Sequence, residues 1–176
     1  MNIFLIAVFL LLQSCATDPF DIPRADVPYP VSIVNDNIND IPAGSDENVW
    51  DKLDYWATPN EFYAKGAGDC EDYAIAKYFT LRKAGIPASK MFLALGFISD
   101  DITEGHMILL VTNNGTKYVL DNMVDGITKL SERPDFKILY SFNENTLLIE
   151  NMRMSPGILP KWKALINRMT KEKNDE

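Results

Sequence analysis

The most informative segment of the chain is GAGDCEDY, residues 66–73. Its two glycines permit a tight backbone, and the residues from Cys70 onward predict a helix that ends near Gly85, with Pro87 after it. Cys70 is therefore expected at the start of a helix. Unpaired backbone N–H groups at such a position stabilise the thiolate, which is the reactive form of cysteine.

Downstream of this helix the sequence predicts an antiparallel sheet. Three apolar runs are typical of strands: residues 91–97, 107–112 and 117–120. An Asn-Gly pair between the last two predicts a hairpin. His106 precedes one strand of this hairpin and Asp121 follows the other, so we expect their side chains to lie close together across the ladder. A helical part with a cysteine at a helix N-terminus, followed by this sheet, predicts an α+β fold.

Cys70, His106 and Asp121 are the residue types that nucleophilic catalysis by a thiol requires. The thiolate attacks, the histidine moves a proton, and the aspartate orients the imidazole. The backbone N–H of Cys70 is a natural oxyanion donor, and the indole N–H of Trp56 is a candidate for a second donor. If the three side chains meet, the chain is a thiol hydrolase or an acyltransferase.

Each of these residues also has a purely structural explanation. A single cysteine is often a small buried apolar residue, a lone histidine is more often structural than catalytic, and an aspartate at a strand end often caps a turn. The polar, glycine-rich surroundings of Cys70 are not a typical core environment, which favours the functional interpretation.

Three carboxylates flank the cysteine: Asp69, Glu71 and Asp72. Unopposed negative charge raises the pKa of a thiol and disfavours the nucleophile. Either solvent and the helix dipole stabilise these carboxylates, or a cation neutralises them. Calcium fits an all-oxygen ligand set best, although the spacing is not that of an EF-hand loop. Zinc is disfavoured because one histidine and one thiol supply too few soft ligands.

The N-terminus predicts export. Residues 1–14 carry no charged side chain, and their apolar core is shorter than the roughly 20 residues of a spanning helix, which is typical of a signal peptide. The following Cys15 completes a segment, Leu-Gln-Ser-Cys, that resembles a bacterial lipobox, so lipidation of Cys15 and a periplasmic, membrane-tethered location are expected. A cleaved ordinary signal or a buried N-terminal strand are the alternatives.

The remaining chain divides by composition. Residues 15–30 are proline-rich and predict a linker, residues 31–155 suit one catalytic domain, and residues 156–176 predict a helical tail that either packs on the domain or binds a partner. The tail pattern rests on the helical spacing of Trp162, Leu165, Ile166 and Met169. The net charge is −8 with no basic run before the C-terminus, which argues against nucleic acid as a partner.

Several motifs occur in order and at natural spacing as in a known family. They are DYWATPxE at 54–61, GAGDCEDY at 66–73, IAKY at 75–78, HM at 106–107, LDN at 120–122, SxRPD at 131–135 and YSFN at 140–143. Together they resemble the bacterial transglutaminase-like cysteine proteinases of the LapG type, over roughly residues 31–145.

This resemblance implies a papain-like, transglutaminase-like core with a Cys-His-Asp triad formed by Cys70, His106 and Asp121. It implies calcium ligands at Asp69 and Glu71, with Asp72 as a further candidate. It also implies a periplasmic, calcium-dependent endopeptidase that cuts the N-terminal retention module of a large surface adhesin near a pair of alanines, and so disperses biofilm. An inner-membrane receptor for cyclic di-GMP sequesters such proteases.

Two features depart from the family pattern, and two other functions stay open. The lipobox at Cys15 suggests a tethered enzyme, whereas the family's usual form is soluble in the periplasm, and the tail from residue 156 lies outside the matching motifs. The same triad would serve an amidase or a cross-linking transglutaminase. A catalytically idle periplasmic binding domain is the third interpretation, and the complete triad argues against it.

Overall fold

A computed structural model of the chain describes residues 29–99, 102, 105–150 and 152–175. The predicted signal peptide at 1–14, the lipidation site Cys15 and nearly all of the predicted linker lie outside the described residues. The first described helix begins at Tyr29, so the last two residues assigned to the linker are helical.

Five α-helices and seven strands make up the described part of the chain. The helices are α1 (Tyr29–Asn39), α2 (Asp46–Trp50), α3 (Pro59–Lys65), α4 (Cys70–Lys83) and α5 (Pro160–Asp175). The strands are β1 (Met91–Ile98), β2 (Gly105–Asn113), β3 (Thr116–Leu120), β4 (Ile127–Lys129), β5 (Phe136–Phe142), β6 (Leu147–Ile149) and β7 (Met152–Met154). Short 3-10 turns lie at Ala88–Lys90, Leu130–Glu132 and Pro156–Ile158.

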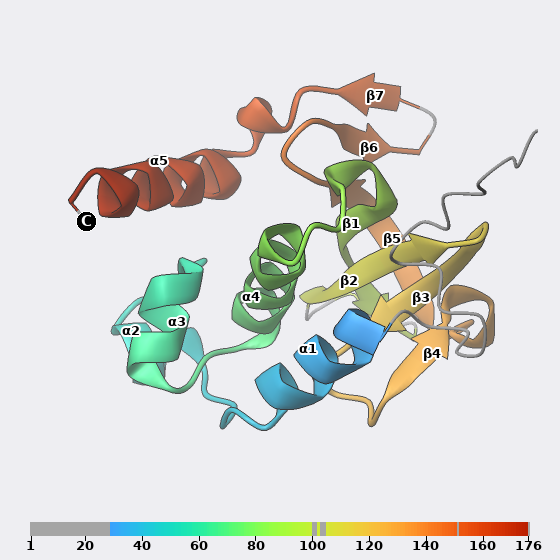
Figure 1. Ribbon diagram of the computed structural model, residues 1–176, viewed down its shortest axis with the longest axis horizontal. Coiled ribbons are helices and arrows are strands. Elements are labelled where there is room, and N and C mark those ends of the chain that lie inside the picture. The colour runs from blue at the N-terminus through green and yellow to red at the C-terminus, as the bar shows by residue number, and fades with distance from the viewer. Residues whose placement is uncertain (1–28, 100–101, 103–104, 151, 176) are drawn as a thin grey trace, which may run out of the picture.

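The strands form one antiparallel sheet in the order β4-β3-β2-β1-β5-β6-β7 (Figure 1). Helix α4 packs against β1 and β2 at the middle of this sheet, and α1 and α3 pack on α4. The α+β prediction is confirmed. Among the described helices, none combines the length and apolar character needed to cross a bilayer.

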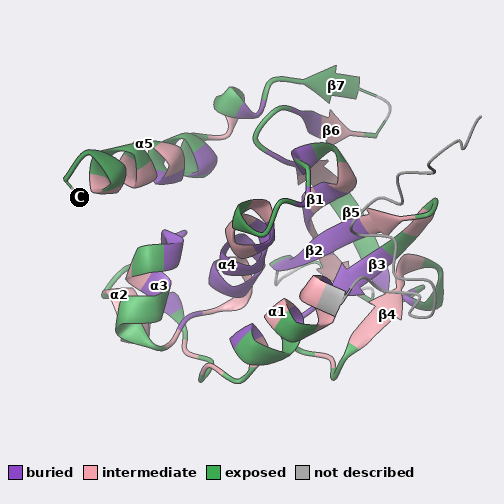
Figure 2. Ribbon diagram, in the orientation of Figure 1, coloured by how far each residue is buried: buried purple, intermediate pink, exposed green. Residues whose placement is uncertain are grey.

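Helix α4 lies at the centre of the core, and Figure 2 shows buried residues, in purple, on α4, β2 and β3. On α4 alone, Ile75, Tyr78 and Leu81 are fully buried. Burying one such side chain contributes roughly 1.5–3 kcal/mol to folding. Because α4 is enclosed by the sheet and by other helices, its first residue, Cys70, is held in a fixed position.

Helix α3 begins with a capping box. The Thr58 side chain accepts the Glu61 N–H at 3.1 Å, and the Glu61 carboxylate accepts the Thr58 N–H at 2.7 Å, with Pro59 at the first helical position. Gly66 ends the helix with φ 67°, a left-handed conformation that favours glycine. The chain then turns directly into α4.

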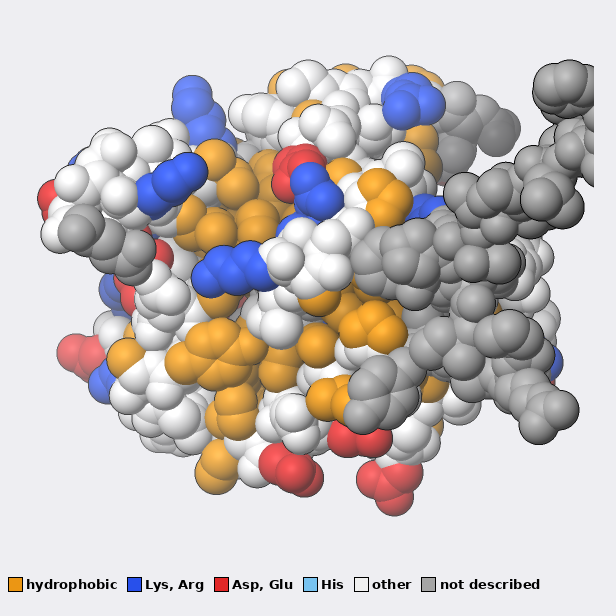
Figure 3. Space-filling view, in the orientation of Figure 1, with side chains coloured by type: hydrophobic (Ala, Val, Ile, Leu, Met, Phe, Trp, Pro, Cys, Tyr) orange, Lys and Arg blue, Asp and Glu red, His pale blue; other side chains and the backbone are white. Residues whose placement is uncertain are grey.

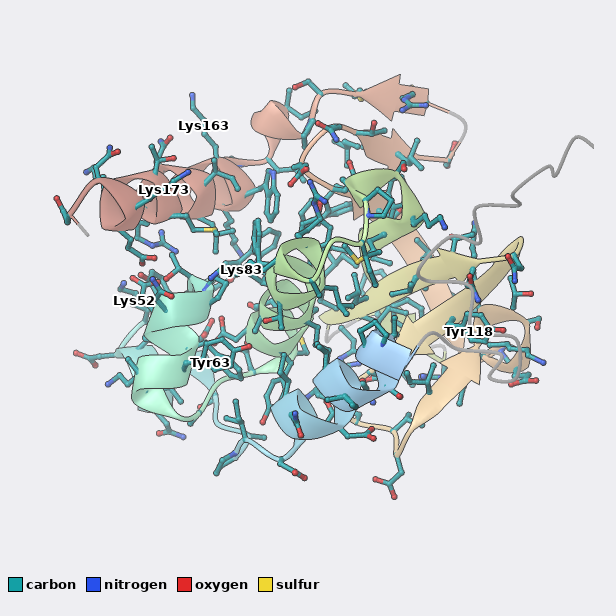
Figure 4. The ribbon with its side chains drawn as sticks, viewed as in Figure 1. Lys52, Tyr63, Lys83, Tyr118, Lys163 and Lys173 are labelled. Carbon is teal, nitrogen blue, oxygen red and sulfur yellow. The ribbon has the colours of Figure 1, made fainter. Side chains whose placement is uncertain are left out.

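Helix α5 packs on the domain with its apolar face. Trp162 and Leu165 are buried, and the Trp162 ring stacks on Phe79 with centroids 5.7 Å apart. Hydrophobic side chains gather on the side of α5 that faces the centre of the molecule in Figure 3, whereas Lys163 points outward in Figure 4. The Thr58 hydroxyl also donates to Glu172 at 2.6 Å, which links α5 to the start of α3.

A close backbone approach at Gly96 gives the first testable prediction. The register between β1 and β5 shifts at this residue, and a Cβ there would lie 2.2 Å from the carbonyl oxygen of Lys137. Gly96→Ala should therefore lower the free energy of unfolding by about 1–3 kcal/mol in urea denaturation, because the backbone must move apart. Gly105→Ala is the matched control, since its Cβ would meet only Leu95 at 3.8 Å. Equal stability of the two variants would contradict this explanation.

Candidate active site

Cys70 is the first residue of α4, and Asp69 is the N-cap. The Cys70 thiol donates to Glu71 Oε2 at 3.2 Å, and the backbone of Met107 on β2 also forms a hydrogen bond to the sulfur. The glycine at 68 is required because a Cβ there would lie 2.5 Å from Asp72 Oδ2. This part of the GAGDCEDY segment therefore brings α4 into close contact with its own preceding loop.

The surroundings of Cys70 oppose ionisation when no cation is present. Burial raises the pKa of the thiol well above its usual value, and the neighbouring Glu71 carboxylate raises it further. The Met107 backbone bond acts in the opposite direction but is outweighed. The carboxylates next to Cys70, which the sequence analysis pointed out, therefore disfavour the thiolate.

His106 and Asp121 meet across the β2–β3 hairpin, as predicted. His106 Nε2 lies 2.8 Å from Asp121 Oδ1, and the two residues are only 5% and 2% exposed. With Nε2 engaged, Nδ1 is the ring nitrogen that remains for a substrate or a thiol. Burial alone would raise the pKa of Asp121, but hydrogen bonds from His106, the Met123 N–H and Arg133 together hold it well below its usual range.

The His106–Asp121 pair and the Cys70 thiol come from elements that pack together. Helix α4 lies against β2, and Met107, whose backbone contacts the sulfur, directly follows His106. A proton transfer between Cys70 and His106 remains a prediction.

A cluster of carboxylates lies next to the thiol, and two of its members were missed by sequence reasoning. Asp69 and Glu71 are joined by Asp46, from the start of α2, and by Asp54, from the loop after α2. Oxygen atoms of Asp46, Asp54 and Glu71 lie within 4.8 Å of one another, as do those of Asp46, Asp69 and Asp72. Local sequence gave no signal for Asp46, because an acidic residue in the first turn of a helix is ordinary.

The residues of this cluster fit a hard cation. Asp46 Oδ1 and Asp69 Oδ1 are buried carboxylate oxygens without a hydrogen-bond partner. Burial, followed by repulsion from Glu71, raises the pKa of Asp69 to about 8. Buried, mutually repelling carboxylates with unsatisfied oxygens are the donors that calcium prefers.

Asp72 differs from the other carboxylates because both of its oxygens already have protein donors. Oδ1 accepts the Ala57 N–H at 2.8 Å, and Oδ2 accepts the Trp50 indole N–H at 3.0 Å. Asp72 therefore ties the segment before α3 to α4, and its role as a metal ligand stays a prediction.

A cleft of about 420 Å³ opens beside these residues. One part of its lining is acidic and includes Asp46, Asp54, Asp69 and Glu71. The other part is apolar and includes Trp56, Leu95, Tyr140 and Leu159. Gly105, the residue before His106, also lines the cleft, so the cleft is bordered by the chain neighbours of both Cys70 and His106.

Trp56 and the first residues of α5 also line this cleft. The Trp56 ring stacks on Phe142 with centroids 5.7 Å apart, which fixes its orientation. Lys161, from α5, pairs with Asp54 and lies 5.6 Å from the centre of the Trp56 ring. The predicted use of the Trp56 indole N–H as an oxyanion donor is not tested by these contacts.

Comparisons with known proteins identify the family of the chain. Residues 25–144 match the model of the family described as bacterial transglutaminase-like cysteine proteinase, BTLCP. The chain belongs to this family. A search of curated proteins found no match.

Three solved structures of LapG from Legionella pneumophila are similar to this protease-family chain. The EGTA-treated structure is 35% identical with a TM-score of 0.70, and covers 79% of this chain and 77% of that chain. A second structure is 36% identical with a TM-score of 0.70 and covers 82% and 79%. The calcium-bound structure is 36% identical with a TM-score of 0.68 and covers 82% of each chain. The chain is thus a LapG-type member of the family.

Proposed function

We propose that the chain is a calcium-dependent cysteine endopeptidase that uses Cys70, His106 and Asp121. The observation that carries this proposal is the buried His106–Asp121 pair, whose histidine lies on the strand that contacts the Cys70 sulfur. Membership of a cysteine proteinase family supports hydrolysis as the reaction.

The chemistry follows from the positions of these side chains. His106 Nδ1 accepts the thiol proton, and the Cys70 sulfur attacks the scissile carbonyl carbon. The backbone N–H of Cys70 stabilises the oxyanion, and His106 then returns the proton to the leaving amine. Water hydrolyses the thioester with His106 as the base. Asp121 holds the imidazole by its Nε2 throughout.

We assign the calcium to Asp46, Asp69 and Glu71, with Asp54 and Asp72 next to them. The fit rests on the unsatisfied buried oxygens of Asp46 and Asp69, and a related LapG has a calcium-bound structure. When bound, calcium neutralises the carboxylates that otherwise disfavour the Cys70 thiolate. Reactivity of this cysteine is thereby conditional on the metal.

The calcium assignment predicts a distinctive pH dependence of stability. Burial raises the pKa of Asp69 to about 8 and that of Asp72 to about 7, whereas both groups ionise near 4 when unfolded. Between pH 4 and 8 the folded state therefore binds more protons than the unfolded state, so stability falls as pH rises. The melting temperature of EGTA-treated protein should fall over this window, and calcium should suppress the fall.

The control for this measurement is Asp69→Asn. It should flatten the decline in EGTA, because one of the groups with a raised pKa is removed. A melting temperature that rises with pH in EGTA, or a calcium effect that is the same at pH 4 and pH 8, would contradict the assignment.

We propose that the substrate is the N-terminal region of a large exported adhesin, cut near a pair of alanines to control biofilm attachment. The proposed site of action is the periplasm, where an inner-membrane cyclic di-GMP receptor would bind the enzyme. A lipid on Cys15 would tether it to the membrane, and nucleic acid is not a partner. The resemblance to LapG-type proteases supports these assignments.

The test is cleavage of a recombinant N-terminal adhesin segment from the same organism. We expect two fragments in calcium and intact substrate in EGTA, with the cut site located by mass spectrometry. An intact substrate in calcium would overturn the adhesin proposal. Incorporation of a primary amine into a glutamine substrate without peptide-bond cleavage would instead identify a transglutaminase, and release of ammonia from side-chain amides would identify an amidase.

A further inference from the structure

We propose that Arg133 is a positioning residue for catalysis, acting through Asp121. Arg133 comes from the loop between the Leu130–Glu132 turn and β5, within the SxRPD segment at 131–135. The reaction described above gives this segment no role. The inference rests on the proposed protease function.

The contacts divide the two oxygens of Asp121 between different donors. Oδ1 accepts from His106 Nε2 at 2.8 Å and from the Met123 N–H at 3.0 Å. Oδ2 accepts from Arg133 Nη1 at 2.9 Å. Arg133 therefore occupies the one carboxylate oxygen that the histidine does not use, and fixes the rotation of the carboxylate that faces the imidazole.

Arg133 is itself held in place from its other side. Its Nε lies 3.1 Å and 3.2 Å from the two oxygens of Asp135, and its Nη2 lies 3.0 Å from Asp135 Oδ2. The guanidinium thus makes a two-pronged contact with Asp135 while its remaining edge reaches Asp121. Arg133 is only 8% exposed and Asp121 only 2% exposed, so the bond between these two side chains forms largely out of water.

This geometry predicts that a lysine cannot fully replace the arginine. An ammonium group can neutralise one carboxylate, but it lacks the planar fork that contacts Asp135 and Asp121 together. Loss of Arg133 would leave Asp121 Oδ2 buried without this donor, and the carboxylate could rotate away from His106. Substitutions within this hydrogen-bond network should therefore have strongly non-additive effects.

The test uses the fact that His106 is the single histidine of the chain. In the full-length protein labelled with 15N-histidine, NMR should show one imidazole with its proton on Nε2. Arg133→Met should produce a mixture of tautomers, and Arg133→Lys should give an intermediate result. Arg82→Met is the matched control, because Arg82 pairs with Glu144 on the surface and should leave the histidine signals unchanged.

A double-mutant cycle gives the second readout. The rate at which iodoacetamide alkylates Cys70 in calcium should fall about tenfold in Arg133→Met, within the range expected for coupling in one network. In an Asp121→Asn background the same substitution should have no further effect. A merely structural role would lower the rate equally in both backgrounds, and would overturn the proposal.

The NMR result separates this inference from the proposed function. If the wild-type protein shows the Nε2-protonated tautomer and Arg133→Met and Arg133→Lys both keep it, the positioning role is wrong even if the enzyme cleaves its substrate. If the tautomer shifts as expected but wild-type protein cleaves no adhesin segment, the proposed substrate fails and the positioning role stands.

Discussion

Replacing Cys70 with alanine should abolish cleavage, with a loss of roughly 10⁴-fold or more, because no other group can form the acyl intermediate. The fold should survive, since alanine is a good helix former and Cys70 is only partly buried at the first position of α4. The measurement is the rate of cleavage of the adhesin segment, together with the melting temperature of each protein.

Cys15→Ala is the matched control, because it removes the other cysteine of the chain and leaves the proposed triad intact. This variant should cleave at the wild-type rate in solution. Cleavage that persists in Cys70→Ala, or that disappears in Cys15→Ala while the protein remains folded, would contradict the assignment of Cys70 as the nucleophile.

Removing calcium should have the second-largest effect. EGTA should stop cleavage, and added calcium should restore it. Two adjacent acidic residues, Asp46 and Glu47, can be substituted in turn to locate the calcium ion. Asp46 is buried and has an unsatisfied oxygen, whereas Glu47 beside it is exposed. Asp46→Asn should weaken calcium binding about tenfold or more in calorimetry, and Glu47→Gln should leave it unchanged.

This comparison separates a specific calcium site from a general charge effect, because the two variants change side chains at adjacent positions of the same short helix. General loss of surface charge would affect both equally. Equal calcium affinity of the two variants, or full activity of protein shown to be free of metal, would contradict the assignment of the acidic cluster as a calcium site.

The hairpin that brings His106 and Asp121 together could be predicted from the sequence because its register is set locally. An Asn-Gly turn fixes which residues of β2 and β3 lie opposite each other, and this places His106 and Asp121 at the same end of the ladder. The position of α4 was equally predictable, because Gly66 ends the preceding helix and Gly85 follows the last turn of α4.

The acidic cluster and the Arg133 contact could not be predicted in the same way. Asp46 lies on a separate short helix and reaches Asp69 only because α2 and the α4 entry fold against each other, as the Gly44–Gly68 backbone bond shows. Arg133 reaches Asp121 only through the path of the loop before β5. Both contacts depend on tertiary packing, which leaves no periodic pattern in the sequence.

The negative charge beside Cys70, the proposed nucleophile, links these observations. Without a cation, burial and Glu71 hold the pKa of the Cys70 thiol well above its usual value. In the proposed enzyme this is a means of control, because the thiolate forms readily only when the carboxylates are neutralised. The protease would then be inactive wherever calcium is scarce.

The reactivity of Cys70 toward iodoacetamide at neutral pH, followed by peptide mapping, tests this control most directly. Rate constants are compared for wild-type protein in calcium, wild-type protein in EGTA, and His106→Ala in calcium. We predict rapid alkylation of Cys70 only in the first case, with a decrease of about tenfold or more in the other two. Equal rates in all three would show that neither calcium nor His106 activates the thiol.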